Sequence, residues 1–299
     1  MVQPAESSSA ACDLCGTSAV RHLYPARDRF HNSDQEFWIA ACCECGVLRT
    51  LPAMAEEELA AFYPDDYWGL ENEPAQEWIA SSQADKLRFL SECKLTSGRI
   101  LDVGCGSGFF LRALDAAQWD RVGVEISEGA AQAARRALGS DRVFAGTLHQ
   151  AAYSDSEFDM VTLWSALEHT NQPRATLVEA RRILRPGGSL IVQLPNADSY
   201  QLSLFSGHWF ALDVPRHRYH FTPKNLEWLL SDAGFTSYHM TFFSRAHNAH
   251  SLRQSLKARL WPNPTTRALF YLSIPFIKPV DFAMSALGRG ATLTIAARG

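Results

Sequence analysis

The chain has 299 residues, of which 46% are apolar, so it can bury a full core and is expected to form one large domain with an accessory segment. A net charge of -4 argues against a general nucleic-acid binder, because such affinity needs clustered Lys and Arg. The first ten residues lack the pattern of a secretory signal and no apolar run is long enough to span a membrane, so we expect a cytoplasmic protein.

The charge is unevenly distributed along the chain. Residues 55–85 hold nine acidic side chains and no basic one, whereas residues 245–299 hold eight basic side chains and one acidic, Asp281. This asymmetry indicates a polarised surface, either two solvated faces of opposite sign or a functional patch.

Residues 1–54 carry two CxxC pairs, each followed by a glycine. Cys12 with Cys15, and Cys42 with Cys45, would each form a tight turn that aims two thiolates at one point, and together they supply a tetrahedral zinc site. A redox dithiol would instead need one pair at the start of a helix in a βαβ setting. We therefore predict a structural zinc ribbon with these four ligands, and Cys43 outside the ligand set.

Residues 55–97 are predicted to be a helical linker. The stretch "EEELAAFYPDDYWG" favours a short acidic helix that ends before Pro64, then a turn with Tyr63, Tyr67 and Trp68. An amphipathic helix is expected over 75–93, packed against the next domain.

The stretch "RILDVGCGSGFFL" predicts a buried strand, a glycine turn and a helix. Gly104, Gly106 and Gly108 occupy alternate positions, and Phe109 stands where a dinucleotide fingerprint has its third glycine. No G-K-S/T follows, so a Walker phosphate loop is excluded as well. The glycines therefore favour a ligand that lies flat against the backbone.

Acidic residues stand at the ends of the first two strands of this unit. Asp102 precedes the glycine turn, and Glu125 ends the strand "RVGVEIS", where a carboxylate can accept both hydroxyls of a ribose.

Strands and helical stretches alternate from residue 98 onward, which predicts an α/β fold with a doubly wound, Rossmann-like, mostly parallel sheet. We expect this domain to span 98–299 with insertions at 195–221 and 245–290. Its strands are predicted at 99–103, 121–126, 142–145, 158–164, 188–194, 235–243 and, last, within "ATLTIAARG".

These motifs, in this order, resemble the class I S-adenosylmethionine-dependent methyltransferases, over about residues 85–244 and the last strand. The matching segments are "LDVGCGSG", "GVEIS", "VFAGTL", "FDMVTLWSALEH" and "RRILRPGGSLIVQLPN". The resemblance implies S-adenosylmethionine as cofactor. Its binding residues would be Asp102, Gly104, Cys105, Gly106 and Gly108 in the first motif, Glu125 at the ribose, Ile126, Thr147 and Leu148 around the adenine, and Trp164 near the sulfonium.

Candidate catalytic residues follow the fourth and fifth strands. Glu168 and His169 lie in "SALEHTNQP"; in ubiquinone-type O-methyltransferases a similar segment begins with a glutamate that contributes to a divalent metal site, but Ser165 stands there in this chain. His217 and His220 lie in the insertion at 195–221, in a run similar to one in zinc-ribbon-headed methyltransferases of the sugar and natural-product type. His169 is expected to be the proton acceptor, with His217 second.

The same insertion supplies basic residues. Arg216 or Arg218 could meet an acceptor carboxylate or phosphate, or could simply cover the edge of the sheet together with Trp209.

Residues 249–287 begin with a basic amphipathic helix that has Leu252, Leu256 and Leu260 on one stripe. An apolar stretch interrupted by Pro275 and Pro279 follows. We expect this insertion to pack over the acceptor site, with a peripheral membrane contact as the alternative.

Together these features predict methyl transfer from S-adenosylmethionine to an oxygen, carbon or nitrogen of a small molecule. The alternative is a ribosomal-RNA methyltransferase with a zinc ribbon, against which stand the acidity of the chain and the absence of an N-P-P-Y type motif. A binding protein without catalysis is disfavoured by the intact cofactor motif.

Overall fold

The computed structural model describes residues 11–29, 35–55, 58–59, 61–63, 73–260, 263 and 265–299. Most of the short acidic helix expected before Pro64 lies outside these residues, as do Tyr67 and Trp68 of the turn after it.

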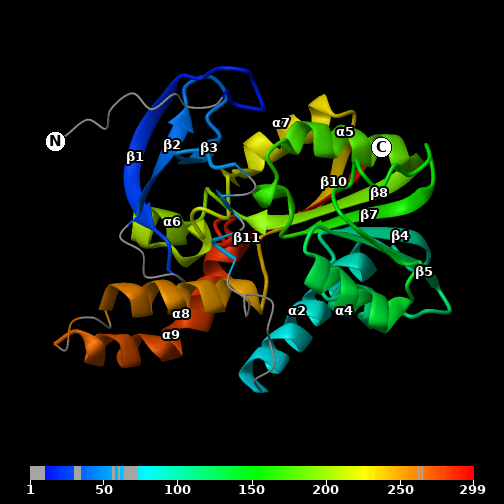
Figure 1. Cartoon of the computed structure of the whole chain (residues 1–299). Helices are drawn as coiled ribbons and strands as arrows, with labels where there is room; N and C mark the ends of the chain where they lie inside the picture. Colours follow the sequence, from blue (N-terminus) through cyan, green and yellow to red (C-terminus); the bar gives the residue numbers. More distant parts are fainter. Residues whose placement is uncertain are drawn as a thin grey trace.

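A seven-stranded sheet forms the centre of the fold, in the order β10-β11-β8-β7-β4-β5-β6 (Figure 1). Neighbouring strands from β8 to β6 pair in parallel, and β11 runs antiparallel to both β8 and β10. The sheet is therefore mostly parallel, as expected. Its strands are β4 (Gly98–Val103), β5 (Trp119–Glu125), β6 (Val143–Ala145), β7 (Phe158–Trp164), β8 (Leu184–Pro195), β10 (Thr236–Thr241) and β11 (Thr292–Arg298).

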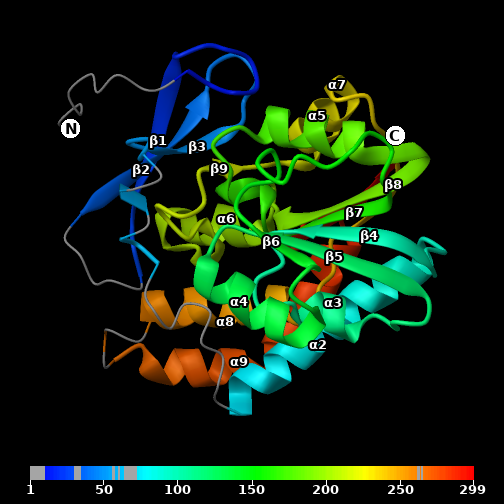
Figure 2. The same ribbon diagram turned by 45° about the vertical axis from the view of Figure 1, so that its right-hand side comes forward.

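Helices cover both faces of this sheet, which is why its central strands are buried apolar runs rather than alternating ones. In both views α5 and α7 lie over one face, and α2 and α4 lie over the other (Figures 1 and 2). Helix α7 begins with a capping box formed by Thr222 and Asn225. The bounds are α2 (Glu73–Glu92), α3 (Phe109–Ala113), α4 (Glu128–Leu138), α5 (Pro173–Ile183) and α7 (Pro223–Asp232).

The N-terminal segment forms a second, antiparallel sheet in the order β1-β2-β3-β9. Strands β1 (Val20–Arg27), β2 (Glu36–Cys42) and β3 (Leu48–Leu51) come from this segment, but β9 (Tyr219–His220) belongs to the insertion that follows β8. A fully buried ion pair between Asp28 and Arg216 joins the same two parts of the chain. The ribbon is thus built into the larger domain by strand pairing as well as by packing.

The two insertions are mostly helical. The first contains α6 (Tyr200–Phe205) and the short 3-10 helices η2 (Ser206–His208) and η3 (Phe210–Leu212); the second contains α8 (His247–Leu260) and α9 (Arg267–Ala286). Within the described residues, no helix is both long and apolar enough to cross a bilayer. Helix α9 continues through Pro275 and Pro279, where the sequence suggests a break. Both prolines are exposed, so water can satisfy the carbonyl groups that they leave without a partner.

Candidate functional site

The glycine turn after β4 is shaped around the carboxylate of Glu125. Gly106 N–H donates to Glu125 Oε2 and Ser127 N–H donates to Oε1, both at 2.8 Å. Gly104, Gly106 and Gly108 all have φ between 54° and 79°, a region that glycine enters without strain. Each carboxylate oxygen keeps a further lone pair, so Glu125 can still accept ribose hydroxyls.

Asp102 lies buried at the end of β4, beside the same turn. Thr162 Oγ1 donates to its Oδ1 at 2.7 Å. Burial raises the pKa of Asp102 to about 6, although the Lys86 ammonium and the Thr162 hydrogen bond act against that rise.

Lys86 on α2 is a site residue that the sequence does not reveal. Its Nζ lies 5.5 Å from the ring centre of Phe110 and 5.3 Å from that of Trp164. Burial lowers the pKa of Lys86 to about 8, and the charge of Asp102 partly offsets this. The ammonium of Lys86 and the carboxylate of Asp102 could together bind the amino-acid end of a zwitterionic ligand.

The other residues expected at the cofactor surround this edge. Glu125 and Leu148 are buried, whereas Ile126, next to Glu125, is 65% exposed and offers an open apolar surface. Thr147 Oγ1 accepts from Gln150 N–H at 3.3 Å. Cys105 is buried, and burial raises its pKa, so we expect its thiol to be protonated and unreactive. The assignment of these residues to the cofactor stays a prediction.

Trp164 ends β7 and packs on the side of the sheet that α2 covers. Its ring contacts Phe89 and Phe110, edge to face. The indole Nε1 is buried with no hydrogen-bond partner among the described residues. Its expected place near the sulfonium stays a prediction.

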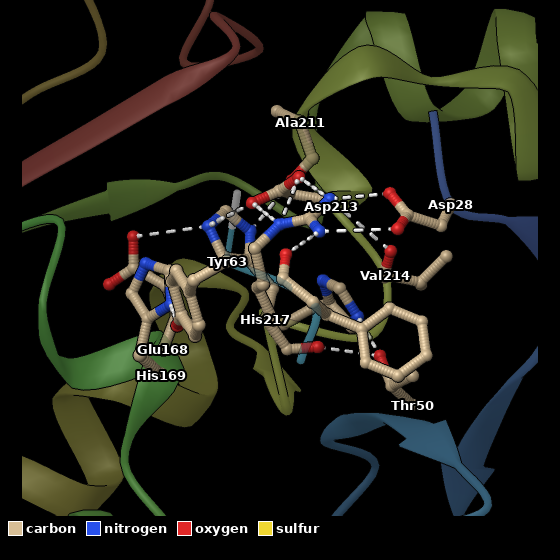
Figure 3. Close-up of polar contacts among 12 residues, drawn as sticks. Asp28, Thr50, Tyr63, Glu168, His169, Ala211, Asp213, Val214 and His217 are labelled. Carbon is tan, nitrogen blue, oxygen red and sulfur yellow. Dashed lines mark hydrogen bonds and ion pairs between the residues drawn. The ribbon is translucent and has the colours of Figure 1, made fainter. Parts of the chain in front are cut away.

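A cluster of titratable residues lies just beyond the end of β7 (Figure 3). His217 Nε2 is 3.9 Å from Glu168 Oε1 and 3.9 Å from Asp213 Oδ2. The rings of His169 and His217 are 4.6 Å apart, and Tyr63 OH is 3.1 Å from His169 Nδ1. Sequence reasoning predicted three of these five residues and missed Asp213 and the role of Tyr63.

Backbone geometry holds the cluster in place. Ser165 has φ of 53°, unusual for a serine, and it turns the chain into the 3-10 helix η1 (Leu167–His169). Arg218 N–H donates to the carbonyl of Glu168 at 2.8 Å, which joins η1 to the insertion. Gly104 lies against this turn, since a Cβ there would come 3.0 Å from Ala166 Cβ. The cluster is therefore next to the glycine turn.

Burial keeps Glu168, His169 and His217 neutral. It raises the pKa of Glu168 to about 8 and lowers those of His169 and His217 to about 3 and 4. His217 Nδ1 lies 3.0 Å from the carbonyl oxygen of Ala211, which can only accept, so Nδ1 carries the proton and Nε2 keeps its lone pair. The Nε2 atom of His217 is thus a ready proton acceptor.

The structure decides one alternative that the sequence left open. Arg216, offered as a contact for an acceptor anion, is fully buried and bonds to Asp28 at 2.8 Å and to Asp213 at 2.7 Å. Its charge is already matched by two carboxylates, so it supports the fold and orients Asp213.

His220, on β9, lies next to the cluster, with its ring centre 6.3 Å from that of His217. Its Nε2 is 3.1 Å from Thr50 Oγ1, and burial lowers its pKa to about 3.

Two groups of residues could hold a metal ion. Glu168, His169 and His217 each offer one ligand atom, and these atoms lie within 4.8 Å of one another. The same holds for the four cysteines of the ribbon. Both oxygens of Glu168 are buried without a hydrogen-bond partner among the described residues, so they could accept a proton, a cation or a ligand.

The cysteine geometry fits tetrahedral zinc. Cys12 Sγ is 3.8 Å from Cys45 Sγ, and Cys15 Sγ is 3.4 Å from Cys42 Sγ. Zn–S bonds of about 2.3 Å would separate neighbouring sulfurs by about 3.8 Å. Cys43 is exposed and lies outside this group; the zinc ligand set stays a prediction.

The comparison with known families decides the class of protein. A family described as "Methyltransferase domain" matches residues 75–240, which include the glycine turn and Glu168. The chain belongs to this methyltransferase family. The cofactor it implies is S-adenosylmethionine, and the carboxylate, ammonium and glycine turn described above fit such a ligand.

Curated relatives of this methyltransferase include enzymes named ubiquinone biosynthesis O-methyltransferase. That of Thiobacillus denitrificans is 27% identical over 168 residues, which cover 52% of this chain and 72% of the relative. The enzyme of that name from Aromatoleum aromaticum is 30% identical over 129 residues, which cover 41% of this chain and 55% of the relative.

Solved structures support the fold. An S-adenosylmethionine-dependent methyltransferase from Thermotoga maritima superposes with a TM-score of 0.52 at 22% identity, covering 81% of this chain and 97% of that one. A protein from Pyrococcus horikoshii OT3 superposes with a TM-score of 0.50 at 20% identity, covering 64% of this chain and 95% of that one. The doubly wound, Rossmann-like fold predicted from the sequence is confirmed.

Proposed function

We propose that this methyltransferase transfers the methyl group of S-adenosylmethionine to a small molecule, with His217 or His169 as proton acceptor. The observation that carries the proposal is the neutral cluster of Glu168, His169 and His217 beside the glycine turn, in which Glu168 and His217 are buried and His169 is half-buried. A group that removes a proton must be deprotonated and within hydrogen-bond reach of the acceptor, and His217 Nε2 meets the first condition.

The reaction would be an in-line displacement. The acceptor atom attacks the methyl carbon, the carbon–sulfur bond breaks, and the sulfonium becomes a neutral thioether. Most of the rate would come from holding the acceptor in line with that bond. Where the acceptor carries a proton, a histidine of the cluster would take it.

Three observations favour a small molecule over ribosomal RNA. Glu168 and His217 of the cluster are buried, the chain is acidic overall, and the curated relatives reported above are named for ubiquinone biosynthesis. In the ribbon, the four cysteines fill their own site, so a zinc ion there would be structural. The atom methylated and the identity of the acceptor stay open between oxygen, carbon and nitrogen.

The test is radiolabelled methyl transfer into a cell extract separated into small molecules and RNA. We expect label in the small-molecule fraction that ribonuclease treatment leaves unchanged. Label confined to the RNA fraction and removed by ribonuclease would contradict the proposal.

A further inference from the structure

Helix α9 turns its more apolar side outward, which is the reverse of an ordinary surface helix. The buried positions of α9 include Asp281 and Ser285 beside Phe270 and Ile277. Its exposed large apolar residues are Leu269, Tyr271, Leu272, Ile274, Phe276, Val280 and Phe282, with Leu287 just beyond the end.

Five of these exposed residues form a stripe. Leu269, Leu272, Phe276, Val280 and Leu287 follow one another at spacings of three, four or seven residues, which places them along one side of a helix. Leu272 and Phe276 are 67% and 65% exposed. A patch of this kind on a protein surface marks an interaction site.

The exposed charged side chains of α8 and α9 have one sign. The exposed ionisable side chains of α8 and α9 are all cationic: Arg253, Lys257, Arg259, Arg267 and Lys278. The one acidic residue of the two helices is Asp281, which is buried. An apolar stripe flanked by cations and free of exposed acids matches an anionic bilayer surface, which offers acyl chains and phosphates together.

We propose that α9 is an interfacial helix that docks this protein on anionic lipid membranes, with the stripe in the headgroup–acyl boundary. A second copy of the chain fits less well, because a two-fold contact through this face would place cation against cation. In both ribbon views α9 lies at an outer edge of the molecule, with α8 between it and the ribbon, so a flat surface can reach it (Figures 1 and 2). The proposal does not depend on which acceptor is methylated.

The test is co-sedimentation of the full chain with two kinds of vesicle: phosphatidylcholine alone, and an equimolar mixture of phosphatidylcholine and phosphatidylglycerol. We expect binding to the mixed vesicles that weakens as salt is raised. Leu272→Ser with Phe276→Ser should weaken that binding by at least about tenfold, because burial of one such side chain is worth about that factor. Lys278→Gln should weaken it about fivefold on mixed vesicles alone.

Val178→Ser is the matched control, because Val178 is 52% exposed but lies on α5, over the other face of the sheet. It should bind vesicles like the wild type. Circular dichroism and cofactor affinity check that every variant is folded. Absence of vesicle binding, equal loss in Val178→Ser, or a dimer seen by light scattering that the Leu272/Phe276 double variant dissociates would each overturn the proposal.

Discussion

The Nε2 atom of His217 lies 3.9 Å from Oε1 of Glu168, and burial makes this a neutral imidazole beside a carboxylic acid rather than an ion pair. In such a pair the Nε2 atom of His217 can accept a proton, while the carboxylic acid of Glu168 holds a second proton nearby. It joins η1, at the end of β7, to the insertion that follows β8, so the site is assembled from segments about 50 residues apart.

The first prediction concerns this proton acceptor. The test compares His217→Ala and His169→Ala with the wild type. The variant that lacks the catalytic base should have a kcat lowered by about 10²- to 10⁴-fold, with cofactor affinity preserved. His149→Ala, at an exposed position, is the control and should retain full activity. If both variants turn over at near the wild-type rate, neither histidine is the base.

The second prediction is a pH dependence. A base works when deprotonated, and burial lowers the pKa of His217 to about 4, so it stays competent down to that pH. The acid limb of the kcat/KM profile should therefore have its midpoint well below 6.5, the ordinary value for histidine. A midpoint near 6.5 would show that the proton acceptor is not a buried histidine of this cluster.

The third prediction concerns the ribbon. Purified protein should carry one zinc ion per chain, measured by elemental analysis, because four thiolates lie at tetrahedral spacing. Cys15→Ser should lose the metal and unfold at lower temperature, since ribbon packing depends on it. Cys43→Ser should keep the zinc ion and the wild-type unfolding temperature. Loss of zinc in that variant would overturn the ligand set.

Local sequence patterns were sufficient to predict those parts of the site in which the residues lie close together along the chain. The glycine turn, Asp102 and Glu125 lie on one βαβ unit, and the cysteine pairs form two tight turns, so spacing alone is enough to predict a ligand turn and a metal site there. The strand pattern also predicted the central sheet, because buried parallel strands are short apolar runs.

Contacts between residues that meet only through tertiary packing could not be predicted from the sequence. Lys86 looks like any solvent-facing lysine of an amphipathic helix until α2 packs beside Phe110. The role of Arg216 was left open between an acceptor contact and a cover for the sheet edge, because its partner Asp28 is 188 positions away in the sequence. The pairing of β3 with β9 likewise depends on where the insertion folds back.

The most direct measurement is calorimetric titration of S-adenosylmethionine into the wild type, Glu125→Ala and Glu128→Ala. Glu125 is buried in the turn, whereas Glu128 is an exposed residue of α4 three positions on, so it serves as the matched control. A carboxylate–hydroxyl contact is worth about 1.5 to 3 kcal/mol, so Glu125→Ala should weaken binding by about 10- to 150-fold and Glu128→Ala should not. Unchanged affinity in a folded Glu125→Ala variant would contradict the placement of the cofactor at this edge of the sheet.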